Sequence, residues 1–174
     1  MNKVNKDTAH ATGKFKLECF DQQGNLKWSA EESNLVVNTG LAQMANSTLA
    51  GSTQVTLWYV GLYGPQSTNN PAASDTAASH PGWTEITPYG NATRPQAVFV
   101  ASAATNPAVV TSSAAPSSFL INSTATVGGA FVISDNTKSG TAGTLFSAAD
   151  FTTADRAVAL GDILNVTYTF SLAG

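Results

Sequence analysis

The fold class is decided by the stretch Leu164-Asn165-Val166-Thr167-Tyr168-Thr169-Phe170-Ser171-Leu172. Its apolar side chains alternate with hydroxyl and amide side chains, so that one face of an extended chain is apolar and the other polar. Period-two alternation of aromatic and β-branched residues is typical of a β-strand with one buried face. We therefore predict that this segment is a strand lying on a hydrophobic core.

Other segments predict further strands. Residues 15–20 alternate in the same way, residues 21–24 have turn composition, and residues 25–30 return as the second strand of a hairpin. Residues 55–63 are too apolar for an edge strand and are expected in the middle of a sheet. Shorter strands are expected at 97–100, 117–122 and 125–134, with Gly128 and Gly129 marking a bulge or a close backbone approach.

One short helix is expected. Asn38 or Thr39 can cap it, Leu41 and Met44 fall at helical spacing, and Gly51 ends it. Residues 148–151 are interpreted as a helical turn. The chain shows no long helical period and no internal repeat. These features predict an all-β fold, an antiparallel β-sandwich with the jelly roll as one of its topologies, over residues 14–174, preceded by an extended N-terminal arm over residues 1–13.

The composition favours a protein that packs against neighbours. Only 11% of the residues are charged, against about 25% in an average soluble domain, and Ala, Ser, Thr, Asn and Gly replace them. The net charge of −3 gives no basic surface for nucleic acid. Residues 1–13 lack the apolar core of a signal peptide, and no run is long enough for a membrane span, so we expect synthesis in a cytoplasm and no membrane contact. Lys3 and Lys6 in the arm could contact an acidic partner surface.

The search for reactive groups predicts that the protein is not an enzyme and holds no cofactor or metal. Cys19 lies on the apolar face of its strand and is interpreted as a small buried hydrophobe. His10 and His80 are far apart and lack ligand spacing. Nucleophile and phosphate-binding motifs are absent from the sequence, and most acidic residues fall at turns.

The aromatic residues leave two alternatives open. Five aromatic residues could form an exposed platform for sugar binding, or they could fill the core and anchor the long loop 64–82. They are Trp58, Tyr59, Tyr63, Trp83 and Tyr89. His80 lies between turn residues and is expected to be exposed or packed on a tryptophan. The candidate partner-binding residues are Lys3, Lys6, His80, Trp83 and Tyr89.

The order of several segments resembles a family of small virion structural proteins of tailed bacteriophages. The similarity covers roughly residues 15–174 and is carried by 58–62, 79–85, 92–95, 129–138 and 161–168. These segments read WYVGL, SHPGWTE, ATRP, GAFVISDNTK and GDILNVTY. The resemblance implies a structural role in a virion, either as a capsid decoration protein or as a tail-fibre-like protein, and it carries no reactive residues.

The leading hypothesis is therefore a capsid cement or decoration protein located in the virion. Its expected partners are the shell of major capsid protein and neighbouring copies of itself, so that it forms a homo-oligomer there. The alternative is a tail or head-fibre component involved in host attachment, which would require exposed aromatics near Trp83 and Tyr89. A virion-borne glycan hydrolase is a third class, for which the sequence offers no positive evidence.

Overall fold

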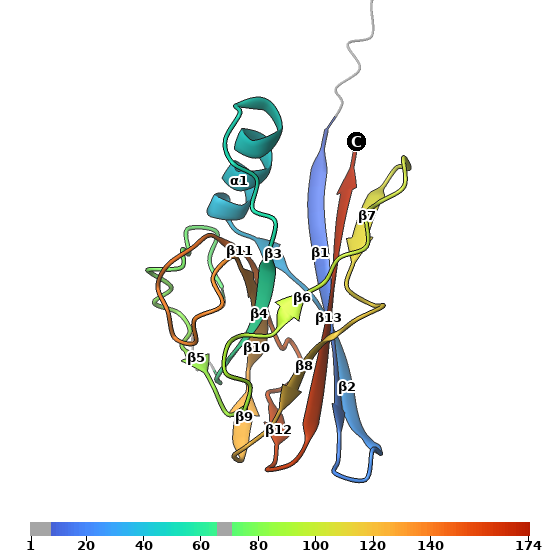
Figure 1. Ribbon diagram of the computed structural model, residues 1–174, viewed down its shortest axis with the longest axis vertical. Coiled ribbons are helices and arrows are strands. Elements are labelled where there is room, and N and C mark those ends of the chain that lie inside the picture. Colours follow the sequence, from blue (N-terminus) through green and yellow to red (C-terminus); the bar gives the residue numbers. More distant parts are fainter. Residues whose placement is uncertain (1–7, 66–70) are drawn as a thin grey trace, which may run out of the picture.

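The computed structural model describes residues 8–65 and 71–174, which form two antiparallel sheets packed face to face, with one helix beside them (Figure 1). The prediction of an all-β sandwich with one short helix is confirmed. Within these two ranges, no helix is long and apolar enough to cross a membrane.

The five-stranded sheet is built around the last strand of the chain. Its strand order is β2-β1-β13-β7, and β8 pairs with the remaining part of β13. Along β13 the side chains of Leu164, Val166 and Tyr168 are buried, as the alternation predicted. The strands are β1 (His10–Phe20), β2 (Leu26–Ser33), β7 (Ala108–Thr111), β8 (Ser117–Leu120) and β13 (Ile163–Ala173).

The second sheet has the order β3-β11-β10-β4-β5, and β6 also pairs with β4. β4 lies inside this sheet, as predicted for residues 55–63. Gly61 on β4 makes room for Phe131 of β10, because a Cβ at Gly61 would lie 2.1 Å from the Phe131 ring. The strands are β3 (Leu35–Val36), β4 (Trp58–Tyr63), β5 (Glu85–Ile86), β6 (Gln96–Ala97), β10 (Gly129–Ile133) and β11 (Leu145–Asp150), and a separate ribbon pairs β9 (Ala125–Val127) with β12 (Arg156–Val158).

Three local predictions need correction. Residues 148–151 are not a helical turn: residues 145–150 form β11, which lies between β3 and β10. The predicted arm does not extend to residue 13, because β1 begins at His10 and pairs with β13 from its first residue. The helix α1 (Asn38–Leu49) has Val37 at its N-cap position and no side-chain cap. Thr39 instead donates a hydrogen bond from Oγ1 to the Leu145 carbonyl at 2.6 Å.

A buried ion pair fastens the loop between β10 and β11 to β5. The guanidinium of Arg94 donates from Nε and Nη2 to the two carboxylate oxygens of Glu85, at 2.9 and 2.6 Å. It also donates to the carbonyls of Asp135 at 2.8 Å and Gly140 at 3.2 Å. The side chains of Arg94 and Glu85 are only 2% and 5% exposed, so this pair is shielded from water.

Candidate interaction surface

The end of the sandwich opposite α1 carries the turn between β1 and β2 (Figure 1). Asp21 organises this turn, because its Oδ1 accepts the backbone N–H groups of Gln23 and Asn25 at 2.9 and 2.8 Å. The side-chain hydrogen bond from Asn25 is the main cause that lowers the pKa of Asp21. Gly24 supplies the positive φ of 84° that the turn requires.

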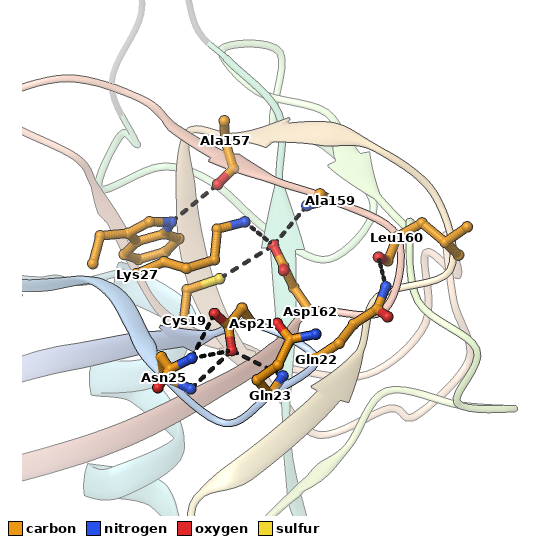
Figure 2. Close-up of polar contacts among 11 residues, drawn as sticks. Cys19, Asp21, Gln22, Gln23, Asn25, Lys27, Ala157, Ala159, Leu160 and Asp162 are labelled. Atoms are coloured by element: carbon orange, nitrogen blue, oxygen red, sulfur yellow. Dashed lines mark hydrogen bonds and ion pairs between the residues drawn. The ribbon is translucent and has the colours of Figure 1, made fainter.

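A second carboxylate, that of Asp162, joins this turn to the start of β13 (Figure 2). Its Oδ2 accepts hydrogen bonds from Lys27 Nζ at 2.5 Å, from the Ala159 N–H at 2.7 Å and from the Cys19 thiol at 3.6 Å. Burial by itself raises the pKa of Asp162, but the hydrogen bonds from Lys27 and Ala159 outweigh it and the pKa is lowered. The carboxylate is therefore ionised at neutral pH and holds three strands in register.

Two further hydrogen bonds fix the same end of the molecule. Gln22 donates from Nε2 to the Leu160 carbonyl at 2.9 Å, and Trp28 donates from Nε1 to the Ala157 carbonyl at 3.0 Å (Figure 2). Gly161 packs against Gln22 so closely that a Cβ there would lie 2.3 Å from the Gln22 amide nitrogen. The turn before β13 thus has one defined position relative to the β1–β2 turn.

Cys19 has no reactive character in this network. Its side chain is fully buried, and burial, followed by the negative charge of Asp162, raises the pKa of the thiol to about 12. The thiol is therefore protonated at neutral pH, while the nucleophilic form is the thiolate. The prediction that Cys19 is a small buried hydrophobe is confirmed. No three His, Cys, Asp or Glu residues cluster as a metal-binding group in the described ranges.

Above this polar network, an apolar row crosses the outer face of the five-stranded sheet. Leu26 pairs with Phe20, Phe20 pairs with Ile163, and Ile163 pairs with Leu120, so the four side chains are cross-strand neighbours. Leu26, Ile163 and Leu120 are 54%, 40% and 56% exposed, and Leu160 in the adjoining turn is 63% exposed. We call these five residues the apolar row. Contiguous exposed apolar side chains with a polar surround mark interaction sites.

Apart from Val109 on β7, which pairs with Ser171 and is 38% exposed, the rest of this outer face is polar and electrically balanced. Lys14 pairs with Glu31, and Lys16 pairs with Glu18 at 2.7 Å, so that these four charges cancel. The outward residues of β13 between Ile163 and the C-terminal end of the strand are small or medium-sized polar residues: Asn165, Thr167, Thr169 and Ser171. The apolar row is thus the main apolar feature of a face that carries little net charge.

A second apolar surface lies at the other end of the sandwich, between α1 and the ends of β1 and β13. Leu41 on α1 and Leu172 on β13 are exposed there, and Met44 lies between them and the core. We call it the helix-end hollow; its lining is Ala9, His10, Ala11, Asn34, Leu35, Val36, Leu41, Met44 and Leu172. It is separated from the apolar row by the length of β1, which spans ten residue steps from His10 to Phe20, or about 33 Å.

Three of the predicted partner-binding residues, His80, Trp83 and Tyr89, belong to neither surface. Trp83 and Tyr89 are only 3% and 1% exposed, so the expectation of an exposed aromatic platform is wrong and the core-filling alternative is confirmed for both. The Trp83 indole donates to Asp75 Oδ2 at 2.8 Å. His80 stacks on Trp83 with ring centroids 3.8 Å apart, so its packing on a tryptophan is also confirmed. Lys3 and Lys6 lie outside the described residues.

Tyr89 is not part of the His80 and Trp83 group. It packs edge-on against Phe119, with ring centroids 4.8 Å apart. Lys138 lies over its ring, with Nζ 4.2 Å from the centroid, and donates to the Tyr89 carbonyl at 2.9 Å. Sequence patterns placed both aromatics among turn residues, but the tertiary contacts bury them.

No protein-family model matches this chain, and no curated protein sequence matches it. The apolar row and the helix-end hollow are therefore the features on which a functional argument can be built.

Proposed function

We propose that this protein is a structural component of a bacteriophage virion, a cement or decoration protein that binds the shell of major capsid protein. The observation that carries the proposal is the pair of uncovered apolar surfaces at opposite ends of one sandwich. A protein that joins neighbouring subunits needs two separate contact surfaces and a body that keeps them apart. The apolar row and the helix-end hollow, about 33 Å apart along β1, meet that requirement.

The polar contacts of the sandwich support a mechanical role. The carboxylates of Asp162 and Glu85 are both buried and are both engaged with a cation, Lys27 and Arg94 respectively. These pairs hold turns and loops in place, and each carboxylate uses its charge for a contact within the protein. A buried pair contributes conformational definition when its hydrogen bonds are satisfied, as they are here.

We assign the shell contact to the helix-end hollow. Its lining combines residues from the start of the chain, Ala9 and His10, with residues of α1 and of the end of β13. Leu41 and Leu172 offer exposed apolar area for the contact. Each contact is small, and repetition over the shell provides the total binding strength by multivalency.

The alternative of a tail or head-fibre protein loses its main support. That hypothesis relied on aromatic side chains able to stack on glycans, and Trp83 and Tyr89 are buried against protein groups. The fibre hypothesis therefore remains as an outcome of the experiment and is not proposed.

The test is cryo-electron microscopy of the intact particle together with a binding assay. We expect density for the chain at repeated positions over the shell, with α1 and the start of β1 facing it. Purified protein should rebind to shells that lack it. Leu41→Glu should abolish rebinding without changing thermal stability, because Leu41 is 42% exposed.

The matched control is Thr126→Glu, which adds the same charge at an exposed position of β9 outside both surfaces. It should rebind like the unmodified protein. Density confined to the neck, the tail or a fibre would overturn the proposal, and so would rebinding of Leu41→Glu at unchanged affinity.

A further inference from the structure

We infer that the outer face of the five-stranded sheet binds the same face of a second copy of this chain, around a two-fold axis parallel to the strands. In this arrangement the apolar row of one copy lies on the apolar row of the other. The inference goes beyond the capsid role and does not depend on it, because it concerns the purified protein alone.

The area of the face suits a stable dimer. β1 and β13 each have eleven residues, which at about 3.3 Å per residue gives a length of about 36 Å. Four neighbouring strands about 4.8 Å apart give a width of about 19 Å. The product, roughly 700 Å², is an upper bound, because β2 has eight residues and β7 and β8 have four each. It approaches the ~800 Å² per partner of a standard protein interface.

The charges of the face also favour an identical partner. The ion pairs Lys14–Glu31 and Lys16–Glu18 leave no excess of either sign among these four groups. Two copies therefore do not repel each other, while a strongly acidic or basic partner would gain nothing from this face. Small side chains such as Thr167 and Thr169 on β13 allow two sheets to approach to the usual distance of about 10 Å.

The position of the apolar row selects the orientation of the axis. An axis parallel to the strands brings together the two ends of the faces that carry the apolar rows. Phe20 and Ile163, in the middle of the row, then meet apolar groups of the second copy. An axis through the middle of the face but perpendicular to the strands would place the row against the opposite end, which carries Thr169, Ser171 and the exposed Val109. That would bury most of the row on hydroxyl groups, so the parallel axis is the better solution. The contact is isologous and closes at two copies.

Rigidity of the row reduces the entropic cost of this association. The hydrogen bonds of Asp162 and Gln22 fix the two turns beside the row (Figure 2). One turn precedes Leu26 at the start of β2, and the other contains Leu160 and precedes Ile163 at the start of β13. The apolar side chains are thus ordered before a second copy arrives, and preordered groups lose less freedom on binding.

The experiment is sedimentation-velocity centrifugation of the full chain over a range of concentrations. We expect a reversible shift from the monomer of 17.9 kDa to a dimer. Leu120→Asp and Leu26→Asp, tested separately, should each weaken dimerisation by about 100-fold or more, because each buries an unpaired charge within an apolar contact. Thermal unfolding of each variant checks that the fold is retained.

Leu41→Glu and Thr126→Glu are the controls and should dimerise normally, since neither lies on the outer face. A protein that stays monomeric up to millimolar concentration would overturn the inference. So would a dimer that survives both row variants, or one that is lost in Leu41→Glu. Because the measurement uses purified protein, failure of the capsid proposal would leave its result unchanged.

Discussion

Replacing Arg94 by Met should destabilise the fold more than almost any other single substitution. The variant keeps the length and apolar stem of the side chain but removes the guanidinium. Among the described residues, Glu85 then retains the Ser139 N–H, at 2.7 Å, as its one hydrogen-bond donor. Its carboxylate is 5% exposed and has little access to water, so it stays behind as an uncompensated buried charge.

The expected magnitude follows from that burial. Removing one partner of a buried ion pair costs about 3–5 kcal/mol. The carbonyls of Asp135 and Gly140, which now accept from Arg94, lose a donor as well. Because the free energy of unfolding of a domain is about 5–15 kcal/mol, Arg94→Met should remove a large part of it.

Urea unfolding followed by tryptophan fluorescence measures the effect, since Trp83 lies in the same part of the sandwich. The double variant Glu85→Gln with Arg94→Met should be more stable than Arg94→Met alone, because no charge is left unpaired. Arg156→Met is the matched control and should cost less than about 1 kcal/mol, because the structure gives Arg156 a hydrogen bond to Thr153 and no ion pair. A loss below about 1 kcal/mol in Arg94→Met, or additive effects in the double variant, would refute the reasoning.

Three other substitutions or treatments test the structure. Cys19 should resist alkylation at pH 8 in the folded protein and react once urea unfolds it, as measured by mass spectrometry, because burial raises its pKa to about 12; rapid labelling of the native protein would contradict this. Asp150→Asn should raise the free energy of unfolding at pH 7, since burial, which is the main cause, raises the pKa of Asp150 and the folded state disfavours its charge. That advantage should shrink as the pH falls through the folded pKa and protonates the unmodified protein, and an advantage that grows on acidification would be inconsistent with it. Gly61→Ala should lower the free energy of unfolding, measured with a chemical denaturant, by about 1–3 kcal/mol, because the new Cβ would meet the buried Phe131 ring. Gly51→Ala is the comparison: Gly51 is open to solvent but has a φ of 70°, and the loss should be smaller there.

Most of the correct fold prediction came from the alternation of apolar and polar residues along the strands. β13, the β1–β2 hairpin and the central position of β4 all follow from the period of the apolar residues. β11 was mispredicted because its residues 145–149 are buried on both faces, and a strand covered on both sides has no alternation to detect. β7 and β12 have only four and three residues, too few to show an alternation.

The interaction surfaces could not be predicted from the sequence, for a different reason. The apolar row consists of residues from β1, β2, β8, β13 and one turn, and its existence depends on the register between strands that are far apart in the chain. Leu26, Leu120 and Leu160 each stand next to turn residues, which is the only local signal they give. Conversely, Trp83 and Tyr89 have polar neighbours in sequence, and only the packing on Asp75 and Phe119 buries them.

The pairing of β1 with β13 also determines the order of events during translation. His10 pairs with Ala173 and Phe20 pairs with Ile163, so every contact between these strands joins residues separated by most of the chain. The ribosome makes β1 and β2 early, and the edge of β1 that later receives β13 stays unpaired while the intervening strands are synthesised. Such non-local pairing slows folding. The nascent chain therefore acquires its five-stranded sheet, and with it the complete apolar row, only after residues 163–173 have left the ribosome.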